Sequence, residues 1–496
     1  MLKKVKKFFS TNYLLIAIMS LASFLRFFRI NDLLGFWYDQ GRDALVIWDM
    51  FHGIKFSLVG QMMGFTGILR GGWFYWLLTP FYALGRGNPI WPTFFLITTS
   101  VLAIFLLYKS GVEIGGKKVG IMSALVASVS IYVINASRWL SGTTPELFVS
   151  ILLFWAVLKF LEKKNWAIPL IAFLVGMSFQ FEGATEVYFV PALLLIFFIN
   201  RKILPSFKTF VLAFVLFMIP AVPQIIFEFR HPGVLSGALY NFVFHEKTFT
   251  FRFWDIVRTR LPYYYGLFYS KFWLNQGILF APFFVLFVFT LATKWKEFWL
   301  SSKFKMLFIF AVAPFIGTLF FISNLGAVYD YYFTAYYLIW ILLFSFVLLS
   351  TSKGQLGRLI IAVFVAVLLV ENAIGYKDSY FISLDDPTRT SFDGQLKAID
   401  WIYKDAGNRD FNFDVYVPPV VPYEFDYFFK WYGNSKYGRI PIEKNIPLLY
   451  TVYEVDGYHP ERLQAWLDRQ KGIGKVLKEQ RFGGITVQER QRILYK

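Results

Sequence analysis

Long apolar segments alternate with short polar loops along most of the chain. A transmembrane helix needs about 17–25 mainly apolar residues, and the pattern predicts a polytopic α-helical membrane protein with about eleven such helices. They fall at roughly residues 13–30, 89–108, 118–136, 146–162, 166–180, 187–200, 208–228, 277–293, 304–323, 334–350 and 357–375.

The segment GGWFYWLLTPFYALG, residues 71–85, is apolar but short for a span. It holds about a dozen apolar residues around Pro80, and segments of that length are more often interfacial or re-entrant than spanning. We therefore place it on the outer surface, inside a large first external loop that covers about residues 31–88.

Basic residues set the expected orientation. Four lysines precede the first span, and basic pairs fall in alternate loops, among them Lys117 with Lys118 and Lys163 with Lys164. Cytoplasmic loops are enriched in Lys and Arg, so we expect these loops and the N-terminus inside, and the C-terminus outside. The stretch MLKKVKKFFSTN resembles a signal peptide, but no small-residue cleavage site follows it. An uncleaved first helix of a multi-pass plasma-membrane protein is the better interpretation.

The pattern changes at about residue 376, where soluble-type sequence begins. Residues 411–417 and 484–488 are predicted strands, and residues 393–405 and 460–470 are predicted helices. We expect a transmembrane domain over residues 1–375 and a small extracytoplasmic α/β domain over residues 376–496.

Composition agrees with a membrane protein and excludes several function classes. The chain is 57% hydrophobic, above the roughly 45–50% of soluble domains, and its net charge of +18 is explained by cytoplasmic loops. The partners expected are membrane lipids, and no nucleic acid. Cysteine is absent, the histidines show no metal-ligand spacing, and no nucleotide-binding or common hydrolase motif occurs. No cofactor is predicted, and the sequence gives no support for a divalent cation.

The stretch FWYDQGRDAL, residues 36–45, places charge at the outer membrane interface directly after the first span. Asp39 and Asp43 are four residues apart, so a helix would carry both on one face with Arg42 beside them. Ionisable groups near the membrane are candidates for function. The alternative is an interfacial helix whose charges face water.

Other polar residues are predicted on the same side of the membrane. Singly, each is more often a cap or an interfacial anchor. Together, acids and arginines on the external face favour a reaction between an acceptor and an anionic lipid. They are Arg70 in the first external loop, Arg138 and Glu146 around a short loop, and Glu182 and Glu186 at a turn.

Three stretches, YDQGRDAL, LVGQMMGFTGILRGGWFYWLL and SRWLSGTTPELF, resemble the GT-C superfamily of membrane glycosyltransferases. The similarity is greatest to the branch that holds protein O-mannosyltransferases and the aminoarabinose transferases that modify lipid A. It covers roughly residues 10–375 and is strongest over 36–165. The resemblance implies a hexosyl- or pentosyltransferase whose sugar donor is carried on a polyprenyl or dolichyl phosphate. The acceptor would be a protein, a lipid or a glycan at the outer face.

The resemblance also implies roles for particular residues. The family has an acidic residue early in the first external loop, generally within an Asp–Glu pair; Asp39 matches it, and Gln40 stands where the glutamate would be. Glu146 is the nearest match to a second acidic site at the start of the fourth span. Arg70 is the best match to the basic residues that help to hold the lipid phosphate.

These residue types suit an inverting transfer, in which a carboxylate takes the proton of the attacking hydroxyl and cations stabilise the phosphate that leaves. We expect Asp39 to be the base. The catalytic candidates are thus Asp39, Asp43 and Glu146, and the substrate-binding candidates are Arg42, Arg70, Arg138, Glu182 and Glu186.

Two other classes remain open. A transporter or flippase of lipid-linked glycans generally carries charged sites near the bilayer midplane and often repeated halves, whereas here the spans are nearly free of charge. A polymerase or ligase of glycans would also use an external loop, but usually lacks the early acidic motif.

Overall fold

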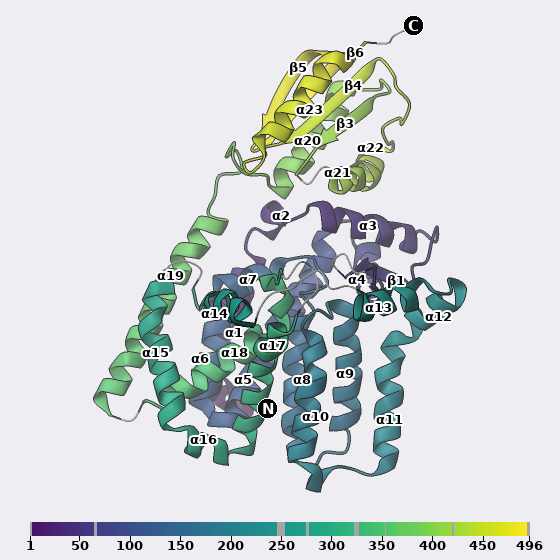
Figure 1. Ribbon diagram of the computed structural model, residues 1–496. Coiled ribbons are helices and arrows are strands. Elements are labelled where there is room, and N and C mark those ends of the chain that lie inside the picture. The colour runs from purple at the N-terminus through teal and green to yellow at the C-terminus, as the bar shows by residue number, and fades with distance from the viewer. Residues whose placement is uncertain are drawn as a thin grey trace.

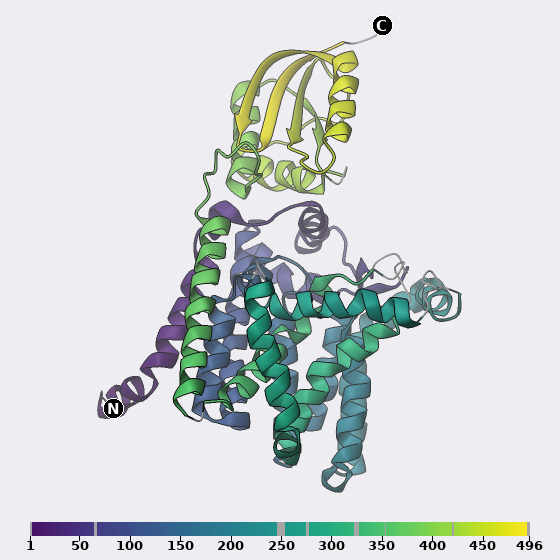
Figure 2. The same ribbon diagram turned by 60° about the vertical axis from the view of Figure 1, so that its left-hand side comes forward.

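The computed structural model describes residues 2–63, 67–245, 253–273, 277–321, 327–352, 354–418 and 421–493. Most of the helices run side by side in one bundle, and a small sheet with its own helices caps one end of it (Figures 1 and 2). Between the two lies a layer of helices that cross the bundle direction, including α3 (Tyr38–Phe51).

Each of the eleven predicted spans coincides with a helix or with two consecutive helices. By length and apolar composition alone, five of the described helices suffice to cross a membrane, or six if the bent pair of α6 and α7 is one span. The number eleven therefore stays a prediction. The helices are α1 (Leu2–Phe27), α5 (Ile90–Gly115), α6 (Lys117–Val129) with α7 (Ile131–Arg138), α8 (Glu146–Leu161), α9 (Ala167–Phe181), α10 (Phe189–Ile199), α11 (Phe207–Met218) with α12 (Val222–Arg230), α15 (Gly277–Thr293), α17 (Ser302–Leu319), α18 (Tyr337–Leu349) and α19 (Gln355–Tyr380).

Shorter elements join these helices. At the end that faces the sheet they are α2 (Ile30–Leu33), β1 (Val59–Met62), β2 (Leu69–Gly71), α4 (Trp73–Leu84), α13 (Val234–Phe244), α14 (Phe253–Tyr269) and the 3₁₀ turns η1 (Glu186–Tyr188) and η5 (Asp330–Tyr336). The remaining connectors are η2 (Arg201–Ile203), η3 (Ile219–Ala221) and α16 (Trp295–Leu300). The predicted short apolar segment 71–85 corresponds to α4.

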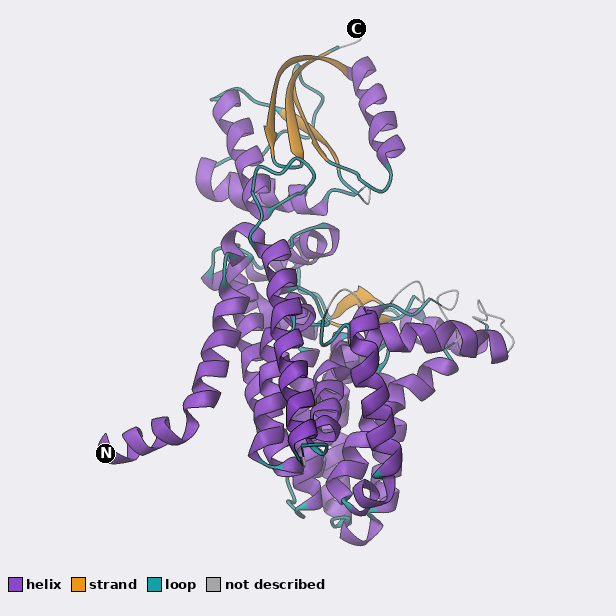
Figure 3. Cartoon of the chain, turned by 90° about the vertical axis from the view of Figure 1, so that its left-hand side faces the viewer, coloured by secondary structure: helices purple, strands orange, loops and turns teal. Residues whose placement is uncertain are grey.

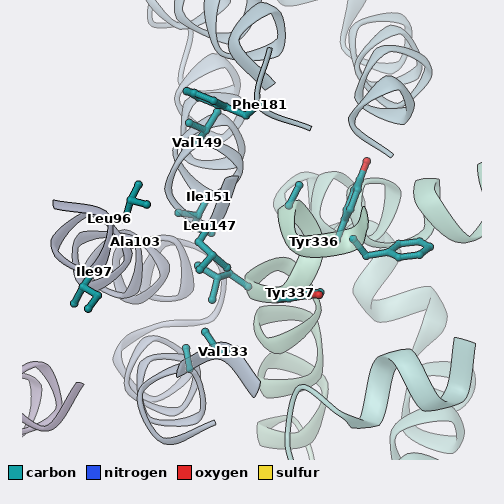
Figure 4. Packing of buried hydrophobic residues seen from close by; sticks show 14 of the residues in the cluster. Leu96, Ile97, Ala103, Val133, Leu147, Val149, Ile151, Phe181, Tyr336 and Tyr337 are labelled. Carbon is teal, nitrogen blue, oxygen red and sulfur yellow. The ribbon is translucent and has the colours of Figure 1, made fainter. Parts of the chain in front are cut away.

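Helix α18 lies at the centre of the bundle. Nearly all of its side chains are buried, as expected of a helix that is apolar on every side. Apolar residues of α5 and α8 pack beside it, and Figure 4 shows Leu96 and Ile97 of α5 with Leu147 and Ile151 of α8 in this core. The core therefore fixes the ends of α8, α9 and α10 at which the predicted site residues Glu146, Glu182 and Glu186 lie.

A buried arginine stabilises the bend between α6 and α7. The two helices meet at 65°, and a break of this kind leaves backbone carbonyls without helical partners. Arg26 of α1 is fully buried and donates to the carbonyls of Ala127 and Ser128, at 2.9 and 3.1 Å, and to Ser137 Oγ at 3.2 Å. The side chain of Arg26 thus supplies hydrogen bonds to the carbonyl groups at the bend and attaches α1 to it.

The C-terminal part contains a four-stranded mixed sheet in the order β3-β4-β6-β5, with β3 parallel to β4 and the other pairs antiparallel. The predicted elements correspond to α20 (Phe392–Ala406), β3 (Asn412–Tyr416), α23 (Pro460–Ile473) and β6 (Ile485–Arg492). Helix α19 continues past residue 376, so the division into two domains there stays a prediction. The elements that the sequence did not indicate are α21 (Tyr423–Phe428), a π-helical turn (Phe429–Gly433), α22 (Asn434–Tyr437), β4 (Leu448–Glu454) and β5 (Gly474–Phe482).

The role of Arg26 is open to test by Arg26→Ala. We expect a loss of about 1–3 kcal/mol in the free energy of unfolding, because buried carbonyls would lose their donors. Thermal unfolding of the detergent-solubilised protein measures it. The matched control is Arg230→Ala, since Arg230 is exposed at a helix end. Equal melting temperatures for the two variants would contradict this role.

Candidate active site

Helix α3 begins at the charged stretch and is fixed at its first turn by Gln40. The side-chain Oε1 of Gln40 accepts a hydrogen bond from Trp37 N at 3.2 Å, and its Nε2 donates to the carbonyl of Leu140 at 3.2 Å. Gln40, at the third helical position, therefore helps to cap α3 and attaches it to the loop before α8.

Arg42 bridges the two aspartates, as the helical spacing predicted. Its Nη1 lies 3.0 Å from Asp39 Oδ1, and its Nη2 lies 3.1 Å from Asp43 Oδ1. The two carboxylates differ in exposure: the Asp39 side chain is 56% exposed and that of Asp43 is 5% exposed. Asp39 is thus the one that a substrate can reach directly.

Asp43 is a buried anchor for three polar side chains. Besides Arg42, it accepts hydrogen bonds from Gln61 Nε2 and, at 3.1 Å, from Tyr75 Oη. Burial raises the pKa of Asp43 to about 6, and the charge of Arg42 opposes that shift.

Arg70 continues the network toward α9. Its Nη1 donates to Gln61 Oε1 at 3.2 Å, and its Nη2 lies 2.9 Å from Glu182 Oε1 at the end of α9. Burial raises the pKa of Glu182, and Arg70 opposes this. Gln61, Arg70 and Tyr75 also line a small pocket between β1, β2, α4 and the end of α9. The structure thus joins Asp39, Arg42, Asp43, Gln61, Arg70 and Glu182 in one chain of contacts.

Glu146 and Glu186 lie next to this network and are fully buried. Glu146 Oε2 accepts from Ser178 Oγ at 3.0 Å, and Glu186 Oε2 accepts from Thr185 N at 3.1 Å. Glu186 interacts electrostatically with Glu146 and Glu182. The Oε1 atoms of Glu146 and Glu186 have no hydrogen-bond partner within the described part of the chain.

Arg138 lies apart from the other predicted residues. Its Nη1 donates to the carbonyls of Arg26 and Phe28, at 3.1 and 2.7 Å, and its guanidinium lies 4.1 Å from the centre of the Tyr380 ring. These contacts connect α7 to the end of α1 and to α19. A role for Arg138 at the lipid phosphate stays a prediction that these contacts do not support.

Sequence reasoning did not find Gln61 and Tyr75. They lie 18 and 32 residues from Asp43, and no periodicity connects such positions. The signal for both was the stretch LVGQMMGFTGILRGGWFYWLL, which contains Gln61 and Tyr75 and supported the resemblance without singling out either residue. Over the described ranges, no three His, Asp or Glu side chains are grouped as metal ligands would be.

The C-terminal part covers α3 through α21. A Cβ atom on Gly41 would lie 2.3 Å from the backbone N of Glu424, so only glycine permits this approach of the two backbones. Lys430 Nζ pairs with Asp49 Oδ1 at 2.8 Å, and Tyr427 donates to the carbonyl of Gly87. Helix α3 therefore lies between the bundle and the C-terminal layer (Figure 3).

The contact at Gly41 predicts the effect of Gly41→Ala. We expect a lower melting temperature, by about 1–3 kcal/mol of unfolding free energy, and slower turnover because Asp39 and Arg42 flank the site. The control is Gly237→Ala: Gly237 lies inside a helix with open space around it, so alanine there should be neutral or slightly stabilising. A Gly41→Ala protein as stable and active as Gly237→Ala would contradict the close contact.

The chain is similar to known proteins both in a family model and in fold. The model described as dolichyl-phosphate-mannose-protein mannosyltransferase matches residues 72–227, whereas no curated protein matches by sequence. The structure of ArnT from Cupriavidus metallidurans bound to undecaprenyl phosphate matches with a TM-score of 0.57 and 12% identity. The match covers 97% of this chain and 98% of that one.

Two structures of the oligosaccharyltransferase from Archaeoglobus fulgidus also match. For AglB in complex with an inhibitory peptide and a dolichol-phosphate, the TM-score is 0.51 at 12% identity, over 94% of this chain and 73% of that one. For the apo form it is 0.51 at 15% identity, over 81% and 59%. The family model and the fold together confirm the resemblance of this chain to the GT-C superfamily of membrane glycosyltransferases.

Proposed function

We propose that this protein transfers a sugar from a polyprenyl or dolichyl phosphate to an acceptor hydroxyl at the outer face of the membrane. The observation that carries the proposal is the contact network of α3: an exposed carboxylate, Asp39, paired with an arginine and linked through buried groups to a second arginine. The matched structures of ArnT and AglB hold undecaprenyl phosphate and dolichol-phosphate, which supports a lipid-phosphate donor.

The proposed topology follows from the basic loops. The N-terminus is cytoplasmic, about eleven helices span the plasma membrane, and the C-terminal domain is extracytoplasmic. Helix α3 then lies at the outer interface, where a lipid phosphate and a water-soluble acceptor meet.

In the proposed reaction, Asp39 is the catalytic base. The acceptor oxygen attacks the anomeric carbon with inversion while its proton passes to Asp39, and the bond from that carbon to the lipid-phosphate oxygen breaks. The leaving lipid phosphate carries the negative charge that develops. Arg42 and Arg70 stabilise it, because guanidinium groups form paired hydrogen bonds with phosphate oxygens.

The remaining carboxylates have supporting roles in this proposal. Asp43 positions Arg42 from beneath and does not touch the substrate, since its side chain is buried. Glu182 holds Arg70. The unpartnered oxygens of Glu146 and Glu186 accept hydrogen bonds from the sugar.

The test of the function uses purified protein in lipid vesicles with a labelled polyprenyl-phosphate sugar. Release of the sugar, by transfer to an acceptor or by hydrolysis, supports the proposal. Movement of the intact labelled lipid across the bilayer without release would instead show a flippase. The same assay serves the three predictions that follow.

Asp39→Asn should reduce turnover by about 10²–10⁴-fold, the usual cost of losing a general base, with little change in stability because the side chain is mostly exposed. The control is Asp49→Asn, a carboxylate of the same helix that pairs with Lys430 instead. Turnover is compared at matched expression and melting temperature. If Asp39→Asn keeps most of its turnover, the base is another residue, and Glu146 is the next to replace.

The dependence of turnover on pH should reflect the protonation of Asp43. As pH falls through about 6, Asp43 becomes protonated, Arg42 loses its buried anionic partner, and turnover should decline. Asp43→Asn should lack that inflection. Burial raises this pKa above the unfolded value, so Asp43 makes the fold more stable, not less, as pH falls through about 6. A melting temperature that falls together with turnover would assign the decline to unfolding.

Arg70 should contribute to donor binding. Replacing Arg70 alone would leave Glu182 as a buried unpaired charge, so the informative comparison is Arg70→Ala with Glu182→Gln against Glu182→Gln alone. We expect the additional loss of Arg70 to raise KM for the donor about 10–100-fold, which corresponds to hydrogen bonds from a charged group. An unchanged dependence of rate on donor concentration would remove Arg70 from the donor site.

A further inference from the structure

The two faces of the C-terminal sheet differ in chemistry. The face that packs on α20 is mainly apolar and buried, with Tyr450, Val452, Ile485 and Val487. Strand alternation places Thr451, Tyr453, Gln488 and Arg490 on the opposite face, beside α23. A sheet face that only packs against a helix is normally apolar, so this polar face calls for another explanation.

Hydrogen bonds hold the C-terminal end of α23 over the polar face, while Trp466 nearer the middle of α23 packs against the rings of Tyr416 and Tyr453. Arg490 is 3% exposed and donates to Thr451 Oγ1 at 3.0 Å and to the carbonyls of Gln470 and Gly474 at 3.0 and 2.9 Å. It also donates to Gln488 Oε1. The guanidinium therefore supports α23 at its C-terminal end.

The space between α23 and strands β5 and β6 is a groove of about 440 Å³. Its walls include Gln464, Leu467 and Lys471 from α23 and Tyr453, Gln488 and Lys475 from the strands. This volume lies in the range of small-molecule sites, about 300–1,000 Å³. Of the described residues that line it, none is acidic.

We propose that this groove binds a saccharide that carries an acidic group. The amide of Gln464, the phenol of Tyr453 and the ammonium groups of Lys471 and Lys475 supply donors and acceptors that sugar hydroxyls need. The Gln488 amide is bonded within the protein, to Thr451, Arg490 and Glu479. Leu467 and the partly exposed Val476 and Ile493 offer apolar patches to the C–H faces of a sugar ring.

The lysines in the walls of the groove are the reason why we expect the saccharide to carry an acidic group. Lys471 and Lys475 lie four residues apart along the chain, at the end of α23 and the start of β5. Lys475 makes no ion pair within the described residues, and Lys471 pairs only with the exposed Asp468, at 2.7 Å. Exposed ammonium groups without a buried acidic partner can pair with a carboxylate or sulfate of the ligand.

This inference goes beyond the transfer reaction and does not depend on it, because binding is measured without a donor. The experiment uses the purified full-length protein and isothermal titration with trigalacturonic acid, with maltotriose as a neutral trisaccharide and triglutamate as an acidic peptide. We expect trigalacturonic acid to bind more tightly than either of the others, and binding to weaken as salt is added.

The variant Lys471→Ala with Lys475→Ala should weaken the binding of trigalacturonic acid at least tenfold, and Gln464→Ala should weaken it less. The control is Lys404→Ala with Lys444→Ala, two exposed lysines of the same C-terminal part that are not in the groove. All three are exposed positions, so melting temperatures should match. Absence of trigalacturonic acid binding, equal binding by the groove double variant, or equal affinity for maltotriose or triglutamate would each overturn the proposal.

Discussion

The end of the bundle that faces the C-terminal sheet depends on the burial of one carboxylate, Asp43. A buried charge is tolerated only when it is paired and hydrogen-bonded, and Asp43 meets this need with partners from α3, β1 and α4. Because those partners come from separate segments, the chain from α3 to α4 folds around Asp43. Arg42 is held in place by it, and Arg42 in turn fixes Asp39 at the surface. The position of the exposed carboxylate of Asp39 therefore depends on the buried carboxylate of Asp43.

Helix α3 is held from the opposite side as well. The backbone of α21 reaches it at Gly41, between the two aspartates. Glu424 of α21 is buried there, and burial raises its pKa to about 8, so at neutral pH it is mostly uncharged. The C-terminal layer can therefore cover an acidic helix without adding a further negative charge. The C-terminal part therefore helps to hold α3 in place, since in Figure 1 no other labelled element covers that side of the helix.

Sequence reasoning succeeded where the physical signal is local. Apolar length located the helices of the bundle, and the four-residue spacing of Asp39 and Asp43 gave the shared face that Arg42 bridges. It could not assign partners across long sequence separations, because Gln61, Tyr75 and Gly41 look unremarkable in isolation. For Arg138, the sequence suggested a role that the contacts in the structure do not support. Its type and predicted side of the membrane suited a phosphate, yet its guanidinium is engaged by two backbone carbonyls and an aromatic ring. Strands β4 (LLYTVYE), which is mainly apolar, and β5 (GKVLKEQRF), which is mainly polar, gave no clear alternation that distinguishes strand from loop.

The order of groups along the network gives the proposed reaction its geometry. Asp39 is the most exposed of the three, Arg42 is partly exposed, and Arg70 is nearly buried, so the network leads from a surface carboxylate inward to a second cation. Of the three buried glutamates beyond Arg70, Glu182 is the one paired with it, and one oxygen each of Glu146 and Glu186 has no hydrogen-bond partner among the described residues. Unpaired acceptors in a dry site are costly until a ligand supplies hydrogen bonds, and the hydroxyl or amino groups of a sugar would supply them. In the proposed reaction these carboxylates face the sugar, whereas Arg42 and Arg70 face the phosphate. A sugar linked to a lipid phosphate has both parts, joined at the bond that the proposed reaction breaks.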